Sequence, residues 1–192
     1  ADIFKAKLYY MSLSVGKGEE FKEQWKNLIS RCDDLDLKID DLFRYYYHII
    51  RGKEGIVIAE KRLREFFQKD PKSPFKTGGY EIVLDDLQKT LDAIEEYYYK
   101  RTEPTRLGAW LQVLDAYTNQ NPVYALIVFL YFHKETTDDA LIEFLKKVLR
   151  YCYYRGSTMS VKFEIYNIIY EVATGLPVDD YLAKNIDSWM WN

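Results

Sequence analysis

The side chains best suited to chemistry in this sequence are its two histidines, His48 and His133, which lie far apart along the chain. A zinc or general-base site needs further ligands or a carboxylate partner at a fixed spacing. No second histidine stands one helical turn from either of them, which favours hydrogen-bonded structural roles for both. A helical hydrolase built on one of these histidines and nearby acids is therefore the least favoured functional class.

Other catalytic patterns are weaker. Gly78 and Gly79 lack the flanking glycines and the Lys-Ser/Thr pair that cradle phosphates, so they predict a loop before a helix. Glu60 and Lys61 are adjacent, whereas the acid-x-Lys strand of metal-dependent nucleases separates the two by one residue and needs several acids around Mg²⁺. We therefore predict no catalytic residue, no metal site and no cofactor.

The two cysteines, Cys32 and Cys152, are also remote from each other in sequence. Their number argues against a disulfide framework and against a cysteine-based zinc site, and it fits the reducing cytoplasm. Cys152 falls on an apolar helical stripe, where a cysteine is most often a small core side chain.

The composition indicates a folded chain that can bury a core. Its 192 residues are 48% hydrophobic and 30% charged, with a net charge of −3. This charge argues against nucleic-acid binding by the whole surface, although it leaves room for a local basic strip. The longest apolar run, residues 123–132, is about half of the ~20 residues that a membrane span requires, so we predict no membrane partner.

Positive charge gathers in two stretches, one within residues 61–76 and the other within residues 146–155. The second stretch interleaves arginine with tyrosine, and these residues together can hold a phosphate backbone and stack on bases. The same composition is typical of protein interfaces, and a solvated helix face is the plainest interpretation of each stretch. Our candidates for contact with a partner or with nucleic acid are Arg150, Tyr153, Tyr154 and Arg155.

Tyrosine is unusually frequent, with 18 residues, and clusters stand at 45–47, 97–99 and 151–154. Consecutive residues on a helix point about 100° apart, so one face cannot bury a whole cluster. Some of these tyrosines must lie at a rim or at a second interface. Our candidates for packing against neighbouring domains are Tyr45, Tyr47 and Tyr99.

Apolar residues recur at intervals of three and four residues along most of the chain, which is the pattern of helices packed on one another. The stripes are Phe21, Trp25, Leu28 and Cys32; Leu42, Tyr46 and Ile49; Leu84, Leu87, Leu91, Ile94 and Tyr98; Leu107, Trp110 or Leu111, Leu114 and Tyr117; and Leu141, Leu145, Val148 and Cys152. We predict an all-α, bundle-like domain of roughly eight to ten helices.

Capping residues predict where several helices begin. Asn121 before Pro122 predicts the start of the wholly apolar helix over residues 123–132, which we expect to be the central one. Thr137, followed by two aspartates, predicts the start of the next helix.

Glycines predict two helix ends, at Gly52 and at Gly156. Further helices are expected over residues 3–8, 60–68, 160–174 and 179–189. The clearest loop is residues 71–79, which is rich in proline and glycine. It separates two possible sub-halves, 1–70 and 80–192, within what we predict to be a single helical domain over residues 1–192. Because the chain opens at Ala1 without an initiator methionine, we expect it to be a piece of a longer protein.

Two stretches resemble a known family. Residues 2–9 (Asp-Ile-Phe-Lys-Ala-Lys-Leu-Tyr), followed by the helix of Phe21 and Trp25, are similar to the segment after the N-terminal domain of GmrSD-type restriction proteins. Residues 151–156 (Tyr-Cys-Tyr-Tyr-Arg-Gly) and 163–173 (Phe-Glu-Ile-Tyr-Asn-Ile-Ile-Tyr-Glu-Val-Ala) resemble the late helices of the same middle region. Their order and spacing suit that region over most of the chain.

The resemblance implies a helical middle domain between two catalytic ones. In this family an N-terminal ParB/sulfiredoxin-like domain with an Asp-Gly-Gln-Gln-Arg signature hydrolyses nucleotide, and a C-terminal HNH-type domain cuts modified or foreign DNA. This sequence has neither signature, so no catalytic residue carries over. The implied role is a non-catalytic, cytoplasmic scaffold in bacterial phage defence. Its candidate partners are the flanking domains, DNA and a second copy of the chain. The alternative is a stand-alone helical protein–protein interaction domain unrelated to DNA.

Overall fold

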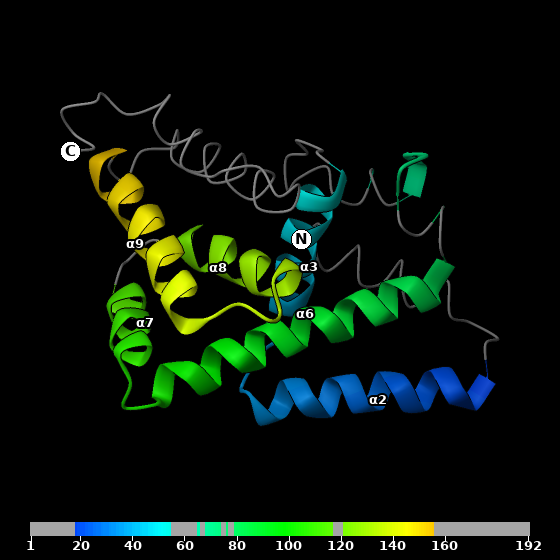
Figure 1. Ribbon diagram of the computed structural model, residues 1–192. Helices are drawn as coiled ribbons and strands as arrows, with labels where there is room; N and C mark the ends of the chain where they lie inside the picture. The colour runs from blue at the N-terminus through cyan, green and yellow to red at the C-terminus, as the bar shows by residue number, and fades with distance from the viewer. Residues whose placement is uncertain are drawn as a thin grey trace.

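The computed structural model describes residues 18–54, 65, 68–73, 76, 79–116 and 121–155 (Figure 1). These residues hold six α-helices and no strand, which confirms the predicted all-α class. The helices are α2 (Gly18–Asp34), α3 (Ile39–Glu54), α6 (Gly79–Thr102), α7 (Arg106–Ala116), α8 (Asn121–Phe132) and α9 (Asp138–Arg155). No helix in these segments is both long enough and apolar enough to cross a bilayer.

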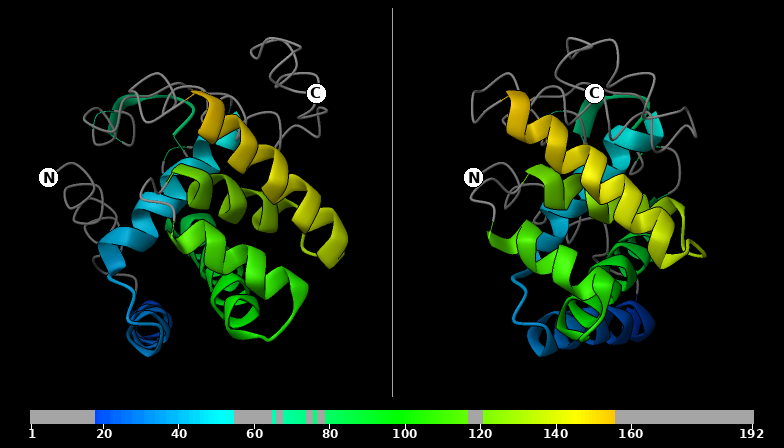
Figure 2. Two further views of the ribbon diagram at one scale, coloured as in Figure 1. Left: turned by 90° about the vertical axis from the view of Figure 1, so that its left-hand side faces the viewer. Right: turned by 60° about the vertical axis from the view of Figure 1, so that its left-hand side comes forward.

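The apolar helix α8 lies at the centre of the described helices, as predicted. It carries no charged residue, so it has no face that favours solvent. Leu126 and Val128 are fully buried, and Tyr131 is nearly so. The helix packs against α3, α6 and α9, and Figure 2 shows it enclosed by them.

The longest helix, α6, connects α8 to the periphery. It packs against α3, α7 and α8, and in Figure 1 it runs between α8 on one side and α2 on the other. Its stripe from Leu84 to Ile94 is buried as predicted. At the end of the stripe, however, Tyr97 is the buried tyrosine, while Tyr98 is half-buried. The reason is that the Tyr97 hydroxyl turns toward α7 and donates a hydrogen bond to Asp115.

The helices on both sides of residues 71–79 share one core. Phe21, Leu28 and Cys32 on α2 and Leu42, Tyr46 and Ile49 on α3 are buried in the same cluster as the apolar residues of α6 to α9. Thus the described parts of the two possible sub-halves pack together, because α3 contacts both α6 and α8.

Side-chain and backbone hydrogen bonds define several helix ends. Thr105 Oγ1 accepts a hydrogen bond from the Gly108 N–H at 3.0 Å and caps the start of α7. Thr137 Oγ1 accepts one from the Ala140 N–H at 3.2 Å, which confirms the predicted start of α9. The prediction at Gly52 is wrong, because α3 continues to Glu54. A glycine costs a helix only about 1 kcal/mol, and the buried stripe of α3 supplies the packing that holds the helix together.

The number of helices predicted from sequence is higher than the six seen in the described residues. The helices expected over residues 3–8, 160–174 and 179–189, and most of the one over 60–68, lie outside those residues. The helix α9 is described through Arg155, directly before the glycine expected to end it.

The turn after α2 contains Asp36 in the left-handed region, with φ of 51°. The Leu37 N–H donates to the Cys32 carbonyl at 2.9 Å, and the Asp36 N–H donates to the Asp33 carbonyl at 3.0 Å. This pair of bonds is the Schellman arrangement, in which glycine is the usual left-handed residue.

We expect Asp36→Gly to raise the free energy of unfolding by about 1 kcal/mol, because glycine adopts this conformation without steric cost and the change removes a negative charge from a helix C-terminus. Urea denaturation followed by circular dichroism measures the change. Asp34→Gly, within the helix, is the control and should destabilise. If Asp36→Gly is also destabilising, the left-handed turn is not the origin of strain.

Gly108 allows α7 to begin close to the end of α6. A Cβ atom at this position would lie 2.1 Å from the Glu103 carbonyl oxygen and 3.1 Å from the Lys100 carbonyl oxygen. Neither oxygen belongs to a flexible side chain, so the backbone itself would have to move.

We expect Gly108→Ala to lower the free energy of unfolding by about 3 kcal/mol. Val113→Ala, at an exposed position of the same helix, should change it by less than about 0.5 kcal/mol. Equal effects of the two substitutions in urea denaturation would contradict this role of Gly108.

Candidate functional site

Acids and histidines do not converge on a metal site in the described part of the chain. No group of three or more His, Cys, Asp and Glu side chains there is arranged to hold a metal ion. Many of the described acids instead bind cationic side chains, as Asp115 binds Arg101 at 2.9 Å and Asp138 binds Lys100 at 2.8 Å. Their positions are those of surface and interhelical ion pairs.

The two histidines occupy different environments. His48 is 4% exposed and stacks on Tyr124 of α8, with ring centroids 4.2 Å apart. His133 is half-buried directly after α8, where its ring lies 4.7 Å from that of Phe129. The first therefore contributes to aromatic packing between α3 and α8, while the second borders an open hollow.

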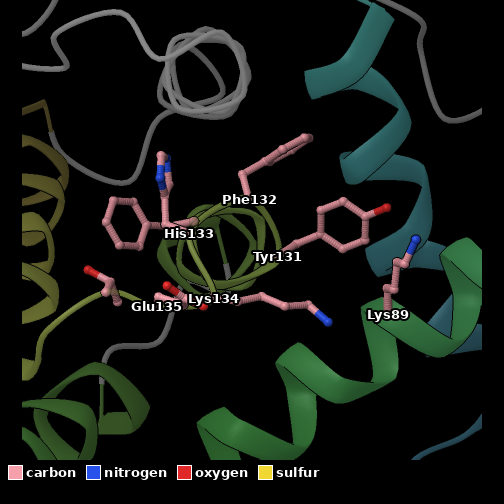
Figure 3. Close-up of a pocket in the computed structure, with 8 residues that line it drawn as sticks. Lys89, Tyr131, Phe132, His133, Lys134 and Glu135 are labelled. Atoms are coloured by element: carbon pink, nitrogen blue, oxygen red, sulfur yellow. The ribbon is translucent and has the colours of Figure 1, made fainter.

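This hollow surrounds the C-terminal end of α8 and has a volume of about 720 Å³. Its lining combines four aromatic or imidazole rings with two lysines, an acid and a hydroxyl: Phe129, Tyr131, Phe132, His133, Lys89, Lys134, Glu135 and Thr136. Figure 3 shows that Tyr131 and Lys134 extend toward α6, whereas His133 points to another side of α8. Lys89, Tyr131 and Lys134 thus lie on the side of α8 that faces α6, and His133 lies apart from them.

The charges of the hollow are balanced by neighbouring acids. Lys89 Nζ lies 2.5 Å from Asp85 Oδ2, and Lys134 Nζ lies 3.4 Å from Asp92 Oδ2. The Tyr131 hydroxyl donates a hydrogen bond of 2.8 Å to Asp86. Burial, followed by this hydrogen bond, raises the pKa of Tyr131 well above its usual range. The bonds of Tyr131 and Lys134 tie the C-terminal end of α8 to α6, while the Lys89 pair lies within α6.

The four contact candidates from the basic stretch lie on the last part of α9, whose backbone is described. The side chains of Arg150, Tyr153, Tyr154 and Arg155 lie outside the described residues. One turn earlier, Lys146 Nζ pairs with Glu143 at 2.7 Å and lies 5.7 Å from the centre of the Trp110 ring on α7. The start of this basic stretch is therefore partly neutralised where it meets α7.

The three tyrosines selected for packing against other domains have distinct positions. Tyr47 is 1% exposed, and Tyr45 is half-buried with its ring 5.3 Å from that of Tyr124. Burial, and then the nearby Tyr98 and Tyr124, raise the pKa of Tyr45. Tyr99 is 69% exposed, so it is the one of the three whose side chain is mainly on the surface. Because Tyr45 lies near both Tyr98 and Tyr124, the tyrosine clusters at residues 45–47 and 97–99 approach each other beside α8.

A polar cluster between α6 and α7 was not identified from the sequence. Tyr97 donates a hydrogen bond to Asp115 Oδ1, and Arg101 Nη1 lies 2.9 Å from Asp115 Oδ2. The Arg101 guanidinium also covers the Tyr98 ring at 4.8 Å. Burial, followed by the bond to Asp115, raises the pKa of Tyr97. Tyr97 and Arg101 are four residues apart on one helix, but nothing in sequence links them to Asp115 on the next.

Comparison with known proteins gives no relative for this chain. No family model matches the sequence, and neither the curated proteins nor the solved structures contain a match.

We expect Tyr97→Phe to lower the free energy of unfolding by about 1–3 kcal/mol, because it removes the donor to a carboxylate at a half-buried contact. Tyr99→Phe, two residues away and exposed, is the matched control and should be neutral within about 0.5 kcal/mol. Thermal or urea denaturation of both variants compares them directly. A neutral Tyr97→Phe would show that the hydrogen bond contributes nothing to the contact between α6 and α7.

Proposed function

We propose that this chain is a non-catalytic helical scaffold in a DNA-targeting defence protein of the GmrSD type, where it couples a nucleotide-hydrolysing domain to a nuclease domain. The observation that carries the proposal is the use of charged side chains as links between helices. Arg31 joins α2 to α6, Arg101 joins α6 to α7, and Lys100 joins α6 to Asp138 at the start of α9. Such links, together with one shared core, favour a helical domain that transmits force between the two domains that flank it.

The family assignment itself rests on the resemblance of residues 2–9, 151–156 and 163–173, and so does the link to DNA. In this proposal the full chain has roughly eight to ten helices, and α9 carries the contact surface at Arg150, Tyr153, Tyr154 and Arg155. Tyr45, Tyr47 and Tyr99 are proposed to support packing against flanking domains, among which Tyr99 has the exposure that a direct contact requires.

The alternative, a protein–protein interaction domain unrelated to DNA, has its own supporting observation. Tyr99 and Val113 are large apolar side chains that are 69% and 54% exposed on α6 and α7. Exposed aromatic and apolar side chains suit contact with a protein partner.

The experiment that separates the two functions is a fluorescence titration of labelled duplex DNA at several salt concentrations. If α9 contacts phosphates, the double substitution of Arg150 and Arg155 by Ala should weaken binding and reduce the slope of log K against log salt by about 2. The control is Lys22→Ala with Lys26→Ala, which removes the same charge from exposed positions on α2. Equal losses in both variants would remove α9 as the contact surface, and no binding by the parent chain would favour the protein-interaction alternative.

A further inference from the structure

The helix α2 is the described helix that is least integrated into the core. In the left view of Figure 2 it lies at the edge of the molecule, seen end-on, while α8 is enclosed by its neighbours. The backbone of α2 approaches α3 most closely and the other helices sparsely. Of its 17 residues, Phe21, Leu28 and Cys32 are buried, and most of the others are exposed.

One arginine supplies a large part of the remaining contact. Arg31 Nε donates to Glu95 Oε1 at 2.9 Å, and its Nη2 donates to Glu95 Oε2 at 2.7 Å and to Asp92 Oδ1 at 2.8 Å. We call this set of bonds the Arg31 clamp. The hydrogen bond to Glu95 is the main cause that raises the pKa of the guanidinium, so Arg31 stays charged in the clamp.

The clamp is open to water and to salt. The side chains of Arg31, Asp92 and Glu95 are 33%, 47% and 38% exposed. Lys134, from the turn after α8, also lies 3.4 Å from Asp92, so part of the carboxylate charge stays balanced when Arg31 leaves. Ion pairs with this exposure weaken as ionic strength rises.

A defined pivot joins α2 to α3. The helix ends in the Schellman turn at residues 33–37, and Asp36 holds a left-handed conformation that is unfavourable for a non-glycine residue. Leu37 follows directly and is anchored in the core. Because the Leu37 N–H donates to the Cys32 carbonyl across Asp36, rotation of α2 about Asp36 breaks this bond, while Leu37 stays in the core just before the start of α3.

We propose that α2 is a hinged arm, which opens from α6 as a unit about Asp36 when the Arg31 clamp breaks, while α3 and α6 to α9 stay folded. Opening separates Arg31 from Asp92 and Glu95 and brings Cys32 into contact with solvent. This is a sub-global opening, whose population is set by the local contacts of α2 and not by the stability of the whole domain.

The thiol of Cys32 reports the opening directly. In the closed state it is 1% exposed, lines a hollow of about 210 Å³ beside the turn after α2, and has a pKa that burial raises to about 11, so labelling is slow until the arm opens. In a Cys152→Ser background, the rate of maleimide labelling under native conditions is proportional to the open population. Arg31→Ala should raise the rate about tenfold or more. The matched control Lys89→Ala removes an ion pair confined to α6 and should leave the rate unchanged.

Two readouts decide the proposal. Added salt should accelerate the labelling of the parent chain and have a smaller effect on Arg31→Ala, and low urea should change the rate only weakly. Labelling that follows the global free energy of unfolding in every variant would overturn the proposal, because Cys32 would then be exposed only when the whole domain unfolds. If Arg31→Ala does not fold, the salt and urea series on the parent chain still test the proposal. A labelling rate of Cys32 that does not respond to salt would overturn the hinged arm.

Discussion

The burial of α8 is the constraint on which the other helices depend. A helix with no charged face is unfavourable at a surface, so most of its sides must be covered. α3, α6 and α9 provide that cover, and each keeps a polar face for solvent. Two hydrogen bonds join polar groups inside the core: the Tyr131 hydroxyl donates to Asp86, and the Thr90 hydroxyl donates to the Asp86 carbonyl. The arrangement of the core follows from this need for enclosure.

Charged residues complete the assembly at the periphery, where burial is incomplete. Arg31, Lys100 and Arg101 each reach an acid on another helix, and so each links two elements in the closed structure. In the hollow beside α8, the two lysines pair with acids of α6, and the imidazole of His133 lies on another side of the helix.

Stability and adaptability are therefore unevenly distributed. The fully buried Leu87 and Leu91 place α6 firmly in the core, whereas α2 depends on three buried side chains and on an exposed clamp. Elements that move in regulated proteins are drawn from the less stable end of such a range. A scaffold between active domains would need this combination, since it must keep its shape while one element responds to its surroundings.

The sequence by itself determined the helical class, the buried stripes and the central place of α8, because the spacing of apolar residues is a local property that helix geometry converts into faces. It also predicted the Thr137 start of α9, since a cap and its helix are neighbours in the chain. Only the tertiary structure decided that Tyr97 is buried at the end of α6, that α3 runs past Gly52, and that Arg31 meets Glu95. These outcomes depend on residues that are distant in sequence, and their positions become defined only when the helices pack.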